Sequence, residues 1–488
     1  MFQTLKNAWK TQELRTKLLF TLLIVILYRL GSAIQVPFVV GVSEALNQNF
    51  NQALTLIAGQ SFEQHTLFAL SVSPYITASI IVQLLTFAIP ALERWAKEGE
   101  EGKKKIDMMT RITTLVLAVI TAVGYAGLLI GQGVTSIELN GKSKIVFINV
   151  FQSNNYAWLK FLVMVACYIA GAMLVMWLAQ KIDDHGIGNG ISVILFANII
   201  ARLPGLILNS YNIIKYAIEG KQAFNIVSTI IWTVLTIGVM IVIVWVVVWF
   251  TDSERRIPVQ YAKKVVGRKM YGGASSNLPL KLNMAGVMPV IFANSIVSIP
   301  GTLATIFSAA WLTNLATYYF SSTKPLYVAL SVILLFAFAY FYIFMSFNPT
   351  EVANNIRNNG GVVPGIRPGK PTRDYIKKIL HRVTLIGAVF LCAVSELPKI
   401  FVSIFVTIID IGVISPSNPF FEFVKKFYDT GFYRVSSVDD LGRIVGEHAF
   451  TTIAFAGTSI LIVVGVILET VRELEAQLTM RNMKGFLD

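Results

Sequence analysis

The chain has 488 residues, of which 55% are hydrophobic and only 14% are charged, whereas a soluble globular domain carries about 25% charged residues. This composition excludes a soluble enzyme or binding domain and predicts an all-α polytopic membrane protein. The net charge of +14 shows that basic residues outnumber acidic ones, and two cysteines give no basis for a disulfide framework.

The N-terminal tail, residues 1–17, is basic and amphipathic. Lys6 and Lys10 lie on either side of Trp9, ahead of the first apolar run. Cationic side chains beside an aromatic ring are typical of a segment that lies on the anionic inner surface of a membrane. No small-residue cleavage site follows a short apolar core, so we expect this tail to be retained on the cytoplasmic side.

Ten apolar stretches are candidate membrane spans, since each span needs about 20 mostly apolar residues. Their cores are residues 18–34, 74–89, 112–130, 158–178, 191–208, 226–250, 285–307, 326–347, 383–397 and 453–468. If both termini are cytoplasmic, most of the 41 lysines and arginines fall in cytoplasmic segments. The positive-inside rule therefore favours that orientation.

Residues 59–90 have an unusual pattern. A short semi-polar helix is expected over residues 59–72, followed by a break at residues 71–74 and then an apolar helix. A half-helix at membrane depth is tolerated only where protein or a water-filled cavity surrounds it. Ile76 and Ile80 lie one turn apart on the apolar helix, so the pattern predicts an aqueous path with an aliphatic constriction. Core packing is the alternative role for any single isoleucine.

Two short loops have recognisable turn signals. Residues 137–147 alternate apolar and polar positions around Asn140-Gly141, which predicts a small outer hairpin. Residues 183–190 are rich in glycine, but no strand precedes them and no lysine follows. A tight turn that starts the next span close to its neighbours is therefore favoured over a phosphate-binding loop.

Two long basic loops, residues 252–283 and 348–382, lie on the predicted cytoplasmic side. The first interleaves basic and apolar residues after Arg255 and Arg256, a pattern that predicts a protruding two-stranded finger. The second is shaped by glycine and proline around Arg367. Loops this long usually carry function, and their charge suits an acidic protein surface or RNA phosphates. Orientation of the chain in the membrane is the alternative role of the charge.

The seventh predicted span is interrupted by Pro289 and contains Asn294. An asparagine facing lipid is costly unless it meets another polar group. Gln83 and Thr86 on the second predicted span are candidate partners. Such pairing is either ordinary interhelical contact or a latch between two movable halves.

Residues 383–414 form an apolar run that is too long for one span and too short for two. Glu396-Leu397-Pro398 is expected to end the span, which leaves residues 400–414 as a re-entrant or interfacial piece. Residues 419–428 repeat aromatic residues at helical spacing, with Lys425 and Lys426 on the opposite side. This predicts an amphipathic helix on the outer surface.

The predicted spans hold few ionisable groups, among them Arg29 and Glu396, and Glu469 directly follows the last span. Ion-coupled transporters normally need such groups at the membrane midplane, so a secondary transporter with inverted repeats is only the alternative function. The sequence has no Walker motif and no nucleophile-base set, so we expect no enzyme. The four histidines are scattered, so we expect no metal or cofactor. A pore-free scaffold would leave the broken helix unexplained.

Several motifs, in the same order along the chain, resemble those of the SecY family, the channel subunits of the bacterial Sec protein translocase. They are residues 28–31 (YRLG), 73–81 (SPYITASII), 185–192 (HGIGNGIS), 278–287 (LPLKLNMAGV), 348–349 (NP) and 363–369 (VPGIRPG). The resemblance covers the chain except for about residues 411–447, an extracytoplasmic insertion whose role it does not indicate.

The resemblance implies an N-terminal half over residues 18–208 and a C-terminal half over residues 226–470, related by inverted symmetry around an hourglass pore. Residues 471–488 would be a cytoplasmic tail. The implied pore ring is Ile76, Ile80, Ile191, Leu195, Ile291 and Ile462. The implied plug, about residues 59–72, includes Gly59, Gln60, Ser61, Phe62, Phe68 and Leu70. Gly59-Gln60 departs from the paired glycines of many relatives at the start of the plug.

The resemblance also implies partners and an activity. Unfolded preproteins would cross the bacterial cytoplasmic membrane, and hydrophobic segments would leave sideways into the bilayer through a lateral gate that includes Gln83, Thr86 and Asn294. The channel would assemble with SecE and SecG and receive energy from the SecA motor ATPase or the ribosome. The implied docking residues are Arg255, Arg256, Lys263, Lys264, Arg268 and Arg367.

Overall fold

The computed structural model describes most of the chain. The described residues are 2–37, 65–131, 135–139, 142–146, 157–201, 238, 240–261, 264–266, 269–271, 275–307, 310–320, 324–410 and 450–484. The predicted amphipathic helix at 419–428 and the insertion at 411–447 lie outside these residues, as do Gly59, Gln60, Ser61 and Phe62.

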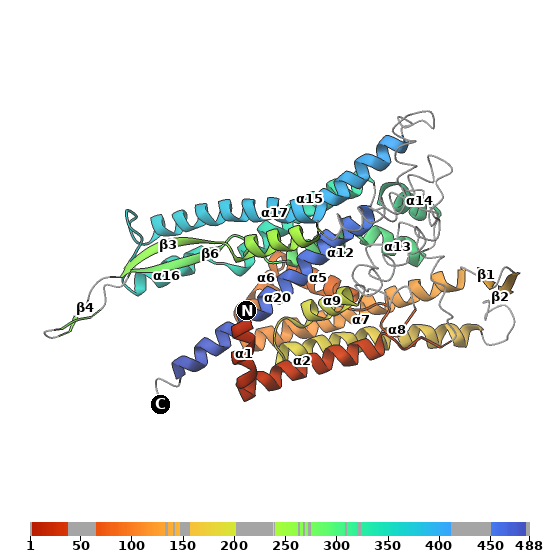
Figure 1. Ribbon diagram of the computed structural model, residues 1–488, viewed down its shortest axis with the longest axis horizontal. Helices are drawn as coiled ribbons and strands as arrows, with labels where there is room; N and C mark the ends of the chain where they lie inside the picture. The colour runs from red at the N-terminus through yellow and green to blue at the C-terminus, as the bar shows by residue number, and fades with distance from the viewer. Residues whose placement is uncertain are drawn as a thin grey trace, which may run out of the picture.

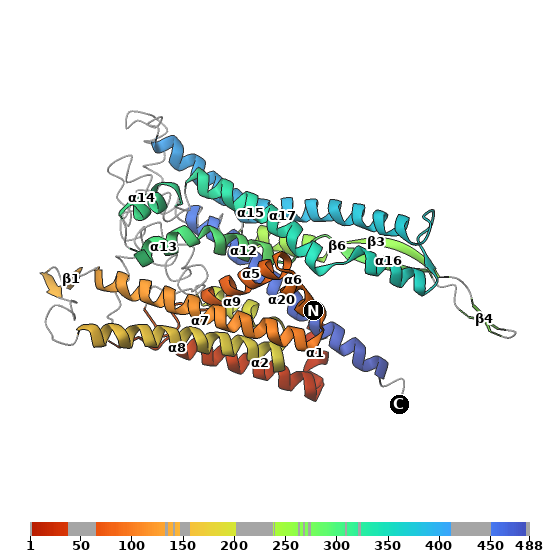
Figure 2. The ribbon, with the colours of Figure 1, turned by 180° about the vertical axis from the view of Figure 1, so that it is seen from behind.

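The protein is mostly helical (Figure 1). The helices are α1 (Phe2–Lys10), α2 (Gln12–Gly31), α5 (Ser73–Ala88), α6 (Pro90–Lys97), α7 (Glu100–Gly131), α8 (Ala157–His185), α9 (Gly190–Ile200), α12 (Met288–Val297), α13 (Ile299–Phe307), α14 (Ala310–Tyr319), α15 (Pro325–Ser346), α16 (Pro349–Asn358), α17 (Lys370–Asp410) and α20 (Phe450–Lys484). In Figures 1 and 2, α2, α7 and α8 line one side and α15 and α17 line the other. Between them lie α5, α9, α12 and α20.

Several helices have the length and apolar character of membrane spans. Within the described ranges, four helices can cross a membrane alone: Glu100–Gly127, Trp158–His185, Pro325–Asn358 and Lys370–Leu397. Helices α5 and α6 make a fifth candidate, broken by a bend of 102°. The bend follows from Pro90, which starts α6 and cannot donate a backbone hydrogen bond to continue α5. Helix α9 and the helix Met240–Asp252 are shorter than the predicted spans, and residues 202–208 and 226–237 of those predictions lie outside the described residues.

The helix break predicted at residues 71–74 is confirmed, since α5 begins at Ser73 with Pro74 in its first turn. The half-helix predicted upstream is wrong for its described part, because residues 65–72 form consecutive turns. His65 and Ser71 have positive backbone φ angles of 52° and 47°. These left-handed conformations interrupt a right-handed helix, which explains why the helix does not form there.

The predicted end of the ninth span is also wrong. Helix α17 continues through Pro398 to Asp410, so the described part of residues 400–414 is not a separate piece of chain. A proline removes one helical hydrogen bond and crowds the preceding turn, which bends a helix more often than it ends a well-packed one. Figure 1 shows α17 changing direction towards its carboxyl end.

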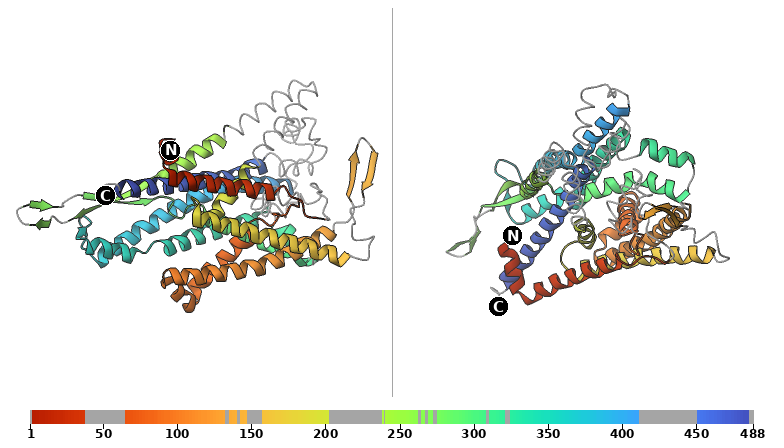
Figure 3. Two further views of the ribbon diagram at one scale, coloured as in Figure 1. Left: turned by 90° about the horizontal axis from the view of Figure 1, so that it is seen from below. Right: turned by 45° about the vertical axis from the view of Figure 1, so that its right-hand side comes forward.

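A small hairpin is confirmed at one end of the helices. Strands β1 (Thr135–Leu139) and β2 (Lys142–Val146) are antiparallel, with Leu139 opposite Lys142. Figure 3 shows this hairpin at the opposite end of the protein from strands β3–β6. Helix α1 and the carboxyl end of α20 lie toward the same end of the protein as β3 and β6.

The two long basic loops form one folded unit, which we call the sheet platform. It consists of β3 (Glu254–Tyr261), β6 (Ser275–Lys281), β7 (Gly361–Val362), α16 and the first turns of α17. Strands β3 and β6 pair over their length, which confirms the two-stranded finger, and β7 adds a short third strand on the other edge of β3. Strands β4 (Lys264–Val266) and β5 (Lys269–Tyr271) form a separate hairpin.

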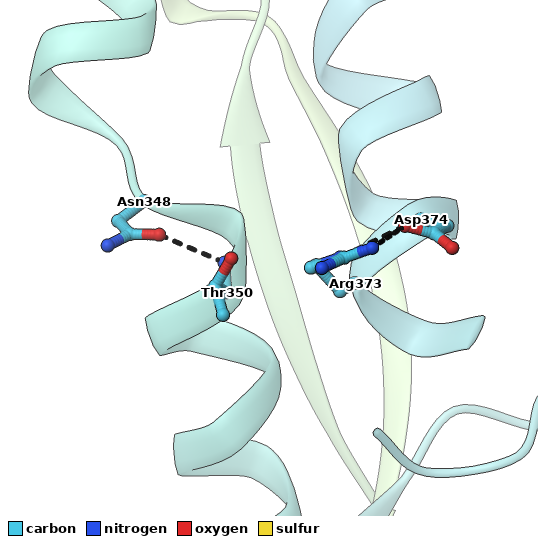
Figure 4. Close-up of polar contacts among 4 residues, drawn as sticks. All are labelled: Asn348, Thr350, Arg373 and Asp374. Carbon is cyan, nitrogen blue, oxygen red and sulfur yellow. Dashed lines mark hydrogen bonds and ion pairs between the residues drawn. The ribbon is translucent and has the colours of Figure 1, made fainter. Parts of the chain in front are cut away.

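The platform has its own apolar core. Alternate residues Ile257 and Val259 of β3 point inward with Leu280 of β6, and Ile356 of α16 and Ile376 of α17 pack against them. Residues 348–382, predicted as a loop, are mostly helical, because α16 and the start of α17 lie within them. Figure 4 shows α16 and α17 flanking the strands. The Asn348 side chain caps α16 by accepting a 3.1 Å hydrogen bond from the Thr350 backbone N–H.

Ile376→Ala tests this core. Ile376 is fully buried between α17 and the strands, so truncation leaves a cavity and should lower the free energy of unfolding of the platform by about 2–5 kcal/mol. Thermal unfolding and limited proteolysis of the purified protein in detergent measure the loss. The matched control is Lys377→Ala at the exposed neighbouring position. Equal stability of the two variants would contradict a platform core.

Candidate functional site

The structure brings all six predicted ring residues into one aliphatic cluster. Ile76 and Ile80 come from α5, Leu195 from α9 and Ile291 from α12, and each of these side chains is 4% exposed or less. Ile191 of α9 and Ile462 of α20 are partly buried and pack against the same cluster. Side chains from four helices that are distant in sequence thus share one hydrophobic cluster, which also contains Phe292 and Phe338. Its apolar composition suits a hydrophobic constriction.

The glycine-rich turn before α9 positions two of these residues, as predicted. Asn189 caps α9 by accepting a 3.1 Å hydrogen bond from the Ser192 backbone N–H. A side chain on Gly190 would lie 2.0 Å from the backbone oxygen of Ala179, so only glycine permits this approach of α9 to α8. Ile191 and Leu195 reach the cluster as a result of this close start.

Asp183 closes the same turn. Its carboxylate accepts a 2.7 Å hydrogen bond from the Gly190 backbone N–H. Burial raises the pKa of the Asp183 carboxyl, despite that hydrogen bond.

The described part of the predicted plug lies against the cluster. Phe68 is 4% exposed, packs with the ring residues and stacks on Tyr28, with ring centroids 5.5 Å apart. Leu70 belongs to a second apolar cluster with Tyr125 of α7 and Tyr168 of α8. Residues 65–72 therefore contribute side chains to both apolar clusters.

A buried polar network holds the end of this segment. The Tyr28 hydroxyl donates a 2.7 Å hydrogen bond to Asn198 Oδ1, and Asn198 Nδ2 donates a 3.0 Å hydrogen bond to Ser71 Oγ. The Tyr28 hydroxyl also lies 3.1 Å from Ser71 Oγ. Sequence reasoning missed Asn198. The available signal was an asparagine within the apolar run of α9.

The predicted lateral-gate residues lie on two helices that pack together, α5 and α12. Gln83 donates a 3.1 Å hydrogen bond to Ser79, and Thr86 donates a 2.7 Å hydrogen bond to the Val82 carbonyl, so these bonds run within α5. Asn294 is 7% exposed on α12. The proposed pairing of Asn294 with Gln83 or Thr86 stays a prediction.

The predicted docking residues that the structure describes lie on the platform or its hairpin. Arg255 and Arg256 are exposed on β3, where Arg256 pairs with Glu254 at 2.7 Å. Lys264 lies on β4, while Lys263 and Arg268 fall outside the described residues. Arg367 is exposed in a turn between Gly365 and Gly369, which have positive φ angles of 79° and 99°. The Thr372 hydroxyl donates a 2.8 Å hydrogen bond to the Arg367 carbonyl.

One turn of α20 joins the platform side to the turn before α9. Arg472 donates hydrogen bonds to the Thr251 carbonyl at 2.8 Å and to Asp252 at 3.2 Å, both just ahead of β3. The neighbouring Glu473 accepts a 2.8 Å hydrogen bond from the Gly188 backbone N–H. Sequence reasoning missed this junction, although adjacent opposite charges directly after a span were a visible signal.

Metal-ligating side chains are dispersed. Across the described ranges, no three His, Cys, Asp or Glu side chains gather closely enough to hold a metal ion. Neither Cys167 nor Cys392 forms a disulfide within the described residues, and both are half-buried.

Comparison with known proteins supplies the family evidence. A family model for SecY matches residues 66–415. The protein translocase subunit SecY of Streptomyces galbus is 36% identical over 496 residues, covering 100% of both chains. A solved structure of a protein-conducting channel aligns with a TM-score of 0.59 and 17% identity over 94% of this chain and 91% of that one. Sec61 in the canine ribosome–channel complex from the endoplasmic reticulum aligns with a TM-score of 0.56 and 16% identity over the same shares.

Asp183→Asn tests the turn before α9. Because burial raises the pKa of Asp183 above its ordinary value of 3.8, the folded chain binds this proton more tightly than the unfolded chain. The contribution of Asp183 to stability therefore falls as the pH rises from 3.8 through the raised value. Asparagine keeps the acceptor for Gly190 without the charge, so D183N should match the wild type at about pH 3 and be more stable at about pH 7.

Thermal unfolding of the purified protein across that pH range measures the difference. The control is Asp184→Asn, which changes an exposed neighbouring carboxylate. Lower stability of D183N than of the wild type at neutral pH would mean that the charge itself supports the turn.

Proposed function

The chain belongs to the SecY family, and on that premise we propose how its parts work as a protein-conducting channel. It conducts unfolded preproteins across a membrane and releases hydrophobic segments into the bilayer. The observation that carries this function is the 36% sequence identity with a translocase subunit over the full length of both chains. The shared hydrophobic cluster of the six proposed ring residues supports it. The secondary-transporter alternative gains no support from these comparisons.

The proposed setting is the bacterial cytoplasmic membrane, with ten spans in two inverted halves. Both termini are placed in the cytoplasm. In support, α1, the carboxyl end of α20 and the basic platform lie toward one end of the protein, opposite the β1–β2 hairpin. The positive-inside rule then assigns the platform end to the cytoplasm.

The aliphatic cluster is the proposed pore ring. A narrow ring of branched side chains excludes water and ions by dewetting when no chain is present. Apolar contacts are non-directional, so the same side chains can close around extended polypeptides of varied sequence. The proposed plug, residues 59–72, would add a second barrier on one side of the ring.

The proposed lateral gate lies between α5 and α12. These helices pack together, yet each also supplies ring residues, so their separation would widen the ring and open a path to lipid at once. A signal sequence that binds between them favours the open state only by its extra affinity for that state.

The platform is the proposed docking site for a motor or a ribosome. It presents Arg255, Arg256 and Arg367 at its surface. These cations suit acidic protein surfaces and ribosomal RNA phosphates. We expect no catalytic activity of the channel itself. The energy for transport would therefore come from SecA or from elongation of the nascent chain on the ribosome. SecE and SecG are the proposed membrane subunits.

Ile80→Asn tests the ring. A polar side chain in the dewetted constriction stabilises water there, so ion leak should rise by about ten-fold and preproteins with weakened signal sequences should be accepted. Planar-bilayer conductance and proteoliposome transport measure the two effects, and Ile291→Asn should behave similarly. The control, Leu85→Asn, places the same side chain at an exposed position of α5. Unchanged leak and unchanged selection in both ring variants would sink the ring assignment.

Arg367→Glu tests docking. Charge reversal at an exposed turn should slow SecA-driven transport by at least about ten-fold, because it replaces attraction to an acidic partner with repulsion, and thermal stability should stay near wild type. The control is Arg357→Glu, an exposed arginine on α16 outside the turn. Normal motor-driven transport by purified R367E would remove this residue from the docking site.

A further inference from the structure

A buried polar triangle joins three segments that are far apart in the sequence. Tyr28 is in α2, Ser71 ends the turns before α5, and Asn198 is in α9. None of the three residues is more than 2% exposed. Their side chains lie among Phe68, Val72 and the aliphatic residues of the ring cluster.

These surroundings make the triangle sensitive to separation. A buried hydroxyl or amide that loses its partner in an apolar site carries the full cost of desolvation. If Ser71 moves away from α9, Asn198 Nδ2 loses its 3.0 Å bond to Ser71 Oγ. The triangle therefore favours one discrete position of residues 65–72 against α2 and α9.

The backbone of the same segment is strained. Ser71 has a φ angle of 47° and His65 has a φ angle of 52°, which are conformations that residues other than glycine rarely adopt. Such conformations persist only where the surroundings over-determine them. Here the triangle holds Ser71, and a 2.6 Å hydrogen bond between His65 Nδ1 and the Tyr125 hydroxyl holds the other end.

Two glycines provide space for the segment between the strained residues. A side chain on Gly31 of α2 would lie 2.0 Å from the Phe68 ring, and one on Gly171 of α8 would lie 1.9 Å from the Leu67 backbone oxygen. The segment is thus seated in gaps between helices, and the Phe68 ring stacks on Tyr28 beside the triangle.

The triangle also lies beside two helices that carry proposed ring residues, at the amino end of α5 and near the carboxyl end of α9. Ser71 is two residues before α5, which carries Ile76 and Ile80, and Asn198 follows Leu195 by one turn of α9. We propose that Tyr28, Ser71 and Asn198 form a polar latch that holds residues 65–72 and the α5–α9 wall of the ring in the closed arrangement. The three are positioning residues that act through the ring, so this inference rests on the proposed channel function.

The first test is Tyr28→Phe, which removes one hydroxyl and keeps the ring that stacks on Phe68. We expect about a ten-fold rise in ion leak from planar bilayers in the absence of a signal sequence, since the loss of one or two hydrogen bonds shifts a two-state ratio by that order. Transport of an intact preprotein should stay near wild type. A merely structural defect would lower transport instead of raising leak.

The matched control is Tyr168→Phe. Tyr168 is also a buried tyrosine, in α8, but its hydroxyl has no hydrogen-bond partner among the described residues. Y168F should therefore leak like the wild type.

A second variant tests the network as a unit. Asn198→Ala removes the shared partner, so it should raise leak to a similar extent. Residues in one network are non-additive, so Y28F combined with N198A should leak much less than the product of the two single effects. If Y28F and N198A leak no more than Y168F, the latch is overturned. If the same variants still transport the intact preprotein, the proposed channel function stands. Failure of the wild-type complex to transport any preprotein would overturn both.

Discussion

The aliphatic cluster is the constraint on which the rest of the structure depends. Helices α5, α9, α12 and α20 each contribute branched side chains to this cluster, although they lie far apart in sequence. The glycine turn before α9, the proline start of α5 and the turns before it all serve this convergence. Since apolar burial is non-directional, the cluster can seal without prescribing one arrangement. Discrete positions must come from polar contacts around it.

Two sets of polar contacts near the cluster differ in kind. Tyr28, Ser71 and Asn198 are neutral and buried, and they join α2, the turns before α5, and α9. Arg472 and Glu473 are charged and join α20 to the base of β3 and to the turn before α9. Helix α9 is thus tethered near both ends, to Glu473 through Gly188 and to Ser71 through Asn198. Helix α9 therefore connects the turn beside α20 with the buried contacts around Ser71 through residues in direct contact.

Local patterns in the sequence predicted local structure well. The alternation in residues 254–261 gave a strand, Asn140-Gly141 gave a hairpin, and Pro74 gave a helix start. Two errors came from the same kind of rule. Pro398 was expected to end a helix that continues to Asp410, and residues 65–72 were expected to be helical although Ser71 and His65 adopt left-handed conformations. For residues 65–72, the contacts of His65 and Ser71 with other helices outweigh the local preference.

The contacts that could not be predicted are those between distant residues. Tyr28 and Asn198 are 170 positions apart, and Gly188 and Glu473 are 285 apart, so no periodicity relates them. The same holds for the platform, where two loops that looked separate share one core through Ile257 and Ile376. The resemblance to a family supplied the ring residues, which composition alone could not distinguish from core isoleucines. What the structure adds is a set of buried hydrogen bonds beside the apolar cluster, and each of these bonds is either made or lost.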